Sequence, residues 1–150
     1  MCKADGGFFS GTNGSDKILI DELKRRNEKF TEEDIQFITR DTSGNIVWLE
    51  SGNPKAGLTH IIERHEKDFK DKCNISKEEL PNFLNEVFSN GEILYNGIVN
   101  EKPGYTRIIK YKDNYFFQAG VGTNGFIIST YPISKKTAQK NINKFTNSSQ

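Results

Sequence analysis

The sequence predicts an α+β domain in which N-terminal helices and a β-hairpin pack on a four-stranded antiparallel sheet. Two observations support this class. Before Glu92 the apolar residues recur mostly at helical spacing, whereas after it they follow a period of two, as in half-buried strands. Helices followed by hairpin-connected strands are typical of α+β proteins. A chain of 150 residues is long enough to bury one core without disulfides or metals.

The N-terminal part divides into a lead-in, a helix and a hairpin. Residues 1–14 are rich in Gly, Ser and Asn and predict a flexible lead-in, so we expect a single domain over 15–150. Ser15 is a suitable N-cap for the first helix, which we place at 15–27. Within 35–49, two apolar, β-branched runs flank a Ser-Gly-Asn turn, and this pattern predicts the hairpin.

Two further helices are predicted before the sheet. Residues 57–69, GLTHIIERHEKDF, carry apolar side chains at helical spacing. Residues 75–91, ISKEELPNFLNEVFSNG, contain Ser76 and Glu79 at the spacing of a capping box, and Gly91 stands at their end.

The second half of the chain predicts the sheet. The turn sequences NEKPG, KDN and GTNG separate four stretches that alternate with a period of two. We place the strands at 93–99, 105–111, 115–121 and 126–131. The polar, basic tail over 133–150 is predicted to be helical at most.

Composition and charge narrow the classes of function. The formal net charge of +1 argues against a strongly basic nucleic-acid binder, although a local basic patch is enough to hold phosphates. Cys2 and Cys73 show no metal-like spacing, so we expect no zinc site, no disulfide framework and no cofactor. The start of the chain lacks the pattern of a signal peptide, and no apolar run approaches the ~18 residues of a membrane span.

Both histidines of the chain, His60 and His65, lie in the helix predicted at 57–69. At about 100° per residue, His65 falls in the middle of the apolar face that should pack on the sheet. His60 falls on a polar shoulder with Arg64, four residues later. His65 therefore either lines a cleft between helix and sheet or is a core histidine with a satisfied ring. His60 is either functional or an ordinary surface residue.

The predicted strands supply further polar side chains. In YTRIIKY, Arg107 and Lys110 fall on opposite faces, because alternate side chains of a strand point in opposite directions. In FIISTYP, hydroxyl groups come from Ser129, Thr130 and Tyr131. The simpler alternative for the charged residues is a half-exposed strand with a solvated lysine.

This set of His, Arg, Lys and hydroxyl side chains suits cleavage of RNA by its own 2′-hydroxyl. A base removes the 2′ proton, cations stabilise the charge on phosphorus, and an acid protonates the leaving 5′-oxygen. No metal is required, because the nucleophile belongs to the substrate. Glycosidase chemistry fits less well, because no pair of carboxylates stands out, and no GxSxG elbow of a serine hydrolase is present. The segment GVGTNG does not match a phosphate-binding P-loop and is interpreted as a hairpin turn.

The chain resembles the C-terminal toxin domains of bacterial polymorphic toxins in the blocks KFTEEDIQFI, GNIVWLESGNPKAGLTHIIERHEKDF and ISKEELPNFL and in the strands YxxIIKY and NGFIISTYP. More narrowly, it is similar to the superfamily that joins barnase, EndoU, colicin and RelE-like ribonucleases (BECR), which includes contact-dependent growth inhibition toxins and phage-encoded relatives. The similarity covers 29–132, and its sharpest part is the motif GLxHIxxRHxxDF.

The resemblance implies a metal-independent ribonuclease, in particular a tRNase, that is part of a larger secreted toxin. Such a toxin is delivered from the producing bacterium and acts in the cytoplasm of the target bacterium. The resemblance also implies a cognate immunity protein that blocks the active site. The catalytic candidates are His65, His60, Arg64, Lys110, Thr130, Ser129 and Tyr131, and the substrate-binding candidates are Arg107, Tyr111 and Asn124. His65 ranks ahead of His60 because it should face the sheet.

Two other hypotheses stay open at this point. The same fold without turnover would be a module that grips RNA or another protein, which the modest net charge and a core position for His65 favour. A nuclease acting on DNA or a transferase is weaker, because a DNase normally needs a metal site and no ligand cluster is visible in the sequence.

Overall fold

The computed structural model describes residues 14–97, 105–121 and 125–148, so the expected lead-in lies outside the described part except for Gly14. The elements in chain order are α1 (Gly14–Arg25), the short 3-10 helix η1 (Glu32–Asp34), β1 (Ile35–Arg40), β2 (Ile46–Glu50), α2 (Leu58–Cys73), α3 (Leu80–Asn90), β3 (Glu92–Gly97), β4 (Tyr105–Tyr111), β5 (Asn114–Val121), β6 (Ser129–Ile133) and α4 (Lys135–Ser148). The predicted α+β class with its four-stranded antiparallel sheet is confirmed.

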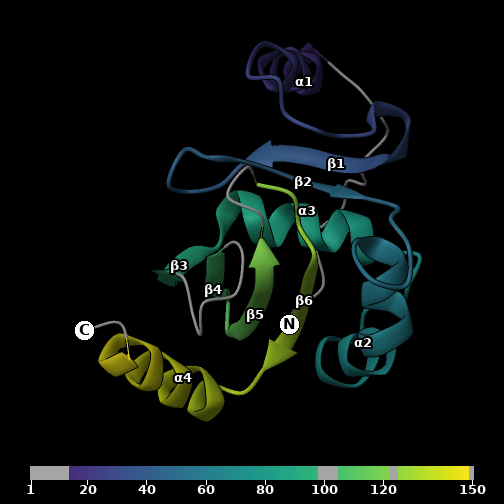
Figure 1. Cartoon of the computed structure of the whole chain (residues 1–150). Helices are drawn as coiled ribbons and strands as arrows, with labels where there is room; N and C mark the ends of the chain where they lie inside the picture. Colours follow the sequence, from purple (N-terminus) through teal and green to yellow (C-terminus); the bar gives the residue numbers. More distant parts are fainter. Residues whose placement is uncertain (1–13, 98–104, 122–124, 149–150) are drawn as a thin grey trace.

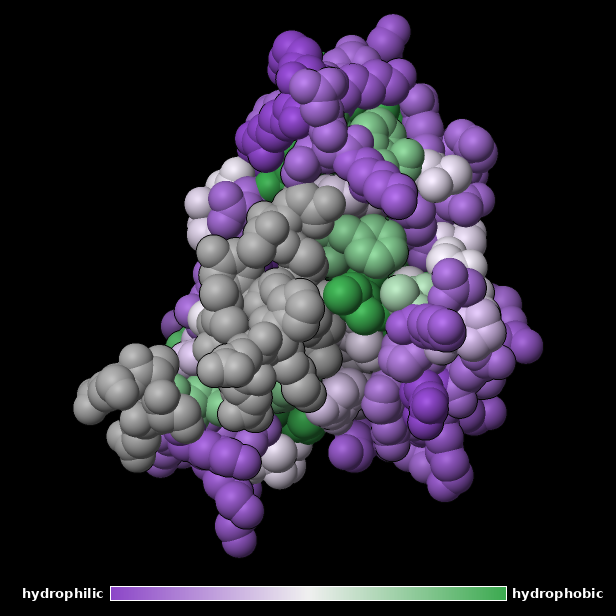
Figure 2. All heavy atoms as spheres, in the orientation of Figure 1, coloured by the Kyte–Doolittle hydropathy of each residue, from purple (hydrophilic) through white to green (hydrophobic). Residues whose placement is uncertain are grey.

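The elements are stacked in layers (Figure 1). Strands β1 and β2 form an antiparallel hairpin, and β3, β4, β5 and β6 form a separate antiparallel sheet in chain order. Helix α3 lies between the hairpin and the sheet, and α2 packs beside β6. Helix α1 covers the outer face of the hairpin, and α4 covers the outer face of the sheet. Figure 2 shows that the visible surfaces of α1 and α2 are mainly hydrophilic, as expected for helices that bury one apolar side.

The centre of the molecule is an apolar cluster enclosed by the hairpin, α2, α3 and the sheet. Phe69 of α2, Phe83 of α3 and Phe116 of β5 are buried there, with ring centroids 5.7–6.4 Å apart. Aromatic side chains remove large areas from water, so these three rings hold α2 firmly against the sheet. This packing sets the position of the helix that carries both histidines.

The last strand begins later than the sequence pattern predicts, at Ser129 instead of Phe126. The segment before it runs parallel to β2: the amide of Trp48 donates to the carbonyl of Gly125 at 3.1 Å, and the amide of Ile127 donates to the carbonyl of Trp48 at 3.0 Å. The segment 125–133 therefore pairs first with β2 of the hairpin and then, as β6, with β5 of the four-stranded sheet. The sequence alone does not mark the point of transfer, because residues 126–128 favour a strand and no Gly, Pro or Asn separates them from β6.

The third predicted helix also begins later, at Leu80. The carboxylate of Glu79 accepts both the amide of Ser76 at 3.1 Å and its hydroxyl at 3.0 Å. The Ser76 hydroxyl thus donates to the carboxylate instead of accepting an amide of the helix, which holds residues 76–79 as a turn ahead of α3.

The C-terminal tail forms a full helix, although the sequence predicted helical structure at most. The Ser134 hydroxyl accepts the amide of Thr137 at 3.0 Å and caps α4. Ala138, Ile142 and Phe145 recur at helical spacing and pack on the outer face of the sheet. In the described part of the chain, every helix is too short or too polar to cross a membrane.

Candidate active site

The turn before α2 is shaped by two glycines. Gly52 and Gly57 adopt φ angles of 67° and 89°, which favour residues without a side chain. A Cβ atom at Gly52 would overlap the carbonyl oxygen of Ala56, so this turn closes more tightly than other residues allow. The amide of Gly57 donates to the carbonyl of Ile128 at 2.9 Å and ties the start of α2 to the segment before β6. The turn thereby holds the carbonyl of Pro54 over the first turn of the helix.

His60 is oriented by that turn. Its Nδ1 atom lies 2.8 Å from the carbonyl oxygen of Pro54. A carbonyl only accepts, so Nδ1 carries a proton, and in the neutral imidazole Nε2 is left as the acceptor. This is the tautomer that a general base needs if Nε2 faces the substrate.

His65 lies where the helical periodicity predicts, between Ile61 and Phe69 on the side of α2 that faces the sheet. Its ring stacks on Tyr131 of β6, with centroids 4.4 Å apart and planes inclined by 24°. Its Nδ1 atom lies 3.1 Å from Oδ2 of Asp68, and 20% of the side chain is exposed. Asp68 was missing from the sequence-derived candidates. Its signal is its position three residues after His65, on the same side of the helix.

The two histidines are neighbours, in contrast to the separate sites that the helical wheel predicts. Their ring centroids are 6.5 Å apart and their planes are inclined by 77°. Five residues correspond to a rotation of about 140°, which places His60 and His65 on different sides of an ideal helix. The wheel gives only the angular position of each residue around the helix and not the direction that its ring takes. Each ring has its Nδ1 atom engaged, which leaves Nε2 as the other nitrogen that can exchange a proton.

Tyr131 completes this cluster. Its ring is held between His65 on one side and Phe117 of β5, whose centroid is 5.3 Å away. Burial raises the pKa of Tyr131 above its ordinary value. The phenol therefore keeps its proton at neutral pH and acts as a hydrogen-bond donor. We call His60, His65 and Tyr131 the imidazole cluster.

The raised pKa of Tyr131 predicts a dependence of stability on alkaline pH. Folding favours the neutral phenol, so its contribution is fully present below about pH 10 and is lost as the pH rises through the raised pKa. The variant Tyr131→Phe cannot ionise. Between about pH 9.5 and 11.5, its free energy of unfolding should fall less steeply than that of the parent in urea titrations. Equal slopes for the two proteins would contradict this expectation.

The hydroxyls of β6 next to Tyr131 are buried. Ser129 is 5% exposed and Thr130 is completely buried. The Thr130 hydroxyl donates to the carbonyl of Phe117 at 3.0 Å, which joins β6 to β5. Arg64, in contrast, is exposed on α2. Arg64 is thus an exposed cationic candidate on α2, the helix that also carries His60 and His65.

Of the predicted substrate-binding residues, Arg107 is buried and Tyr111 is partly buried. Arg107 and Asp41 are only 4% and 6% exposed, and Nη1 of Arg107 lies 3.4 Å from Oδ2 of Asp41. Nε of Arg107 donates to Oδ1 of Asn96 at 3.2 Å. The Tyr111 hydroxyl donates to Oε2 of Glu86 at 2.5 Å. We assign these contacts a role in joining the sheet to the hairpin loop and to α3.

The remaining two candidates lie elsewhere. Asn124 is outside the described residues. Lys110 lies on the opposite face of β4 from Arg107, as the strand period predicts, and lines a pocket separate from the imidazole cluster.

Neither a protein family nor a curated protein matches the sequence. Within the described ranges, no group of three or more His, Cys, Asp and Glu side chains is arranged as ligands for a metal ion. The geometry of the imidazole cluster is therefore the basis for the functional argument.

Proposed function

We propose that this protein is a metal-independent endoribonuclease toxin with tRNA as its substrate, of the BECR type that its sequence resembles. The observation that carries the proposal is the pair of imidazoles 6.5 Å apart, each with its Nδ1 atom engaged and Nε2 available. Two positioned imidazoles can supply both proton transfers of this reaction, one as base and one as acid.

The contacts of each ring support an assignment of roles. His60 faces a neutral carbonyl, which suits the neutral imidazole that takes the 2′-hydroxyl proton. His65 faces the carboxylate of Asp68, which forms an ion pair with an imidazolium, so His65 gives its proton to the leaving 5′-oxygen. The 2′-oxygen attacks phosphorus, the bond to the 5′-oxygen breaks, and the products are a 2′,3′-cyclic phosphate and a 5′-hydroxyl.

Two further groups assist the charged phosphorane. The Tyr131 phenol keeps its proton because burial raises its pKa, and it donates to a non-bridging oxygen. The exposed guanidinium of Arg64 supplies a positive charge from the same helix.

The proposed delivery, place of action and protein partner are taken from the resemblance of the sequence to bacterial polymorphic toxins. The domain would be delivered from the producing bacterium within a larger secreted toxin and act in the cytoplasm of the target bacterium. A cognate immunity protein would protect the producing bacterium by covering the imidazole cluster.

Incubation with total tRNA in the presence of EDTA tests the proposal. We expect cleavage, because both proton transfers come from side chains and the nucleophile comes from the RNA. The fragments should carry 2′,3′-cyclic phosphates, and their new 5′ ends should accept a radiolabelled phosphate without prior dephosphorylation. Intact tRNA at stoichiometric enzyme, or cleavage that appears only after magnesium is added, would reject the proposal.

One observation favours a second function, a module that binds RNA or protein without turnover. The His65 side chain is only 20% exposed, stacked and hydrogen-bonded, as a purely structural histidine would be. Saturable RNA binding by a protein that leaves the RNA intact would establish this alternative.

A further inference from the structure

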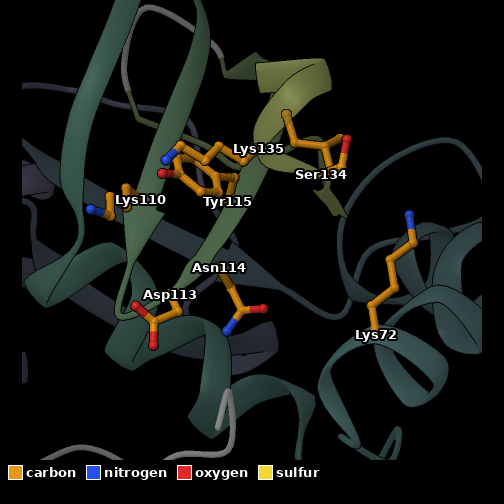
Figure 3. A pocket seen from close by; sticks show the side chains of 8 residues that line it. Lys72, Lys110, Asp113, Asn114, Tyr115, Ser134 and Lys135 are labelled. Atoms are coloured by element: carbon orange, nitrogen blue, oxygen red, sulfur yellow. The ribbon is translucent and has the colours of Figure 1, made fainter. Parts of the chain in front are cut away.

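A pocket of about 520 Å³ lies farther along α2 and is lined by three lysines, Lys72, Lys110 and Lys135. They come from the end of α2, from β4 and from the first turn of α4, and Figure 3 shows Lys72 on one side of the pocket with Lys110 and Lys135 on the other. Asp113 is the one carboxylate among the lining residues. The pocket thus carries an excess of positive charge, although the whole chain is nearly neutral.

Apart from the Asp113 carboxylate, the charged side chains of the pocket are donors to an anion. The Nζ atom of Lys110 lies 6.0 Å from the ring centroid of Tyr115, which keeps the ammonium over an aromatic face. Within the part of the chain that the structure describes, none of the three lysines is paired with a carboxylate. Tyr115 adds a hydroxyl to the wall, whereas the Ser134 hydroxyl is engaged with Thr137. Three cationic side chains against one carboxylate make the electrostatic potential of the pocket favourable for an anion.

The pocket lies next to the imidazole cluster. Tyr115 pairs with Ile133, and Phe117 pairs with Tyr131, so the two sites occupy adjacent rows on one face of the sheet, about 7 Å apart along the strands. Along α2, Lys72 follows His65 by seven residues, or about 10.5 Å of helix. One strand of RNA that runs along α2, beside the part of this face that α4 covers, can therefore contact both sites.

We propose that the lysine pocket binds a backbone phosphate of the RNA that neighbours the scissile phosphate, and so forms a substrate-binding subsite. This inference rests on the proposed ribonuclease function and adds where the RNA runs: along α2, from the imidazole cluster toward the start of α4. It also gives Lys110 a role in holding RNA instead of a role at the reacting atoms. A local patch of this kind explains how a protein of net charge +1 can hold RNA.

Binding of an RNA oligonucleotide with 2′-O-methyl groups tests the pocket separately from catalysis, because this RNA lacks the attacking hydroxyl. The triple variant Lys72→Gln/Lys110→Gln/Lys135→Gln should bind at least tenfold more weakly than the parent in fluorescence anisotropy at low salt. Its slope of log affinity against log salt should fall by about 0.7 for each phosphate that the variant no longer neutralises. The single variant Lys72→Gln, at an exposed position of α2, should show a smaller loss in the same direction and does not threaten the fold.

The matched control is the triple variant Lys17→Gln/Arg25→Gln/Lys29→Gln, which removes the same charge at exposed positions in and after α1. It should bind within about twofold of the parent at each salt concentration, because a charge far from the bound strand releases no counterion. Equal affinities of the two triple variants would overturn the subsite. Cleavage of unmodified tRNA by the parent is measured alongside. If the parent cleaves tRNA but the two triple variants bind RNA equally well, only the subsite is rejected. If only the lysine-pocket variant loses binding but the parent does not cleave tRNA, only the proposed ribonuclease function is rejected.

Discussion

Replacement of His65 by alanine is expected to lower the rate of tRNA cleavage by about a hundredfold or more, while the protein stays folded. A positioned general acid contributes roughly 10²–10⁴ in rate, and His65 is the imidazole whose Nδ1 atom faces the Asp68 carboxylate. The same loss is expected for His60→Ala. Because the two imidazoles act in one reaction, the double variant should be little slower than either single variant.

Two further variants separate catalysis from packing. His65→Phe keeps an aromatic ring that can stack on Tyr131 but has no proton to transfer, so it should be as slow as the alanine variant and more stable. Glu63→Gln, at an exposed position of the same helix, should cleave like the parent. Cleavage is followed on denaturing gels, and folding by circular dichroism. Parental activity of His65→Phe would show that His65 only packs and would contradict its role as the general acid.

Replacement of Arg107 by methionine should destabilise the protein by about 3–5 kcal/mol, because it leaves a buried carboxylate without its partner. Arg107 and Asp41 are almost completely buried, and their charged atoms are 3.4 Å apart. The loss should appear as a lower midpoint of urea unfolding with little change in its slope.

The double variant Arg107→Met/Asp41→Asn serves as the control for the buried charge. Asn at position 41 keeps an oxygen for the amides of Ser43 and Asn45, which Oδ1 of Asp41 accepts at 2.9 and 3.0 Å. Because no charge is then left unpaired, this variant should recover part of the lost stability. An Arg107→Met protein with parental stability but weakened RNA binding would instead support the substrate-binding role that the sequence indicated.

The elements that the sequence predicted well are those whose signal is local. The hairpin predicted within 35–49 is found as Ile35–Arg40 and Ile46–Glu50, and the strand predicted at 105–111 is found as Tyr105–Tyr111. Turn residues and the two-residue period determine these strands without help from distant parts of the chain. The position of His65 on the buried side of α2 follows from the helical period in the same way.

The misplaced boundaries depend on contacts between distant segments. The transfer of Ile127 to β2 requires Trp48 to offer its backbone to a second neighbour, which no local pattern near residue 127 encodes. Helix α4 contains only a few apolar residues, so its periodicity is weak. It forms because the sheet presents Ile108 and Phe117 to that narrow apolar side.

For the candidate site, the sequence was enough to indicate the residue types that suit RNA cleavage. It also predicted that His65 lies on the side of α2 that faces the sheet. How these groups combine depends on tertiary structure. The fold places the Pro54 carbonyl against Nδ1 of His60 and the ring of His60 beside that of His65. It also buries Arg107 against Asp41 and lines one pocket with Lys72, Lys110 and Lys135. The period of side chains is a property of one element, whereas a site forms where separate elements meet, and the packing of the whole core sets where they meet.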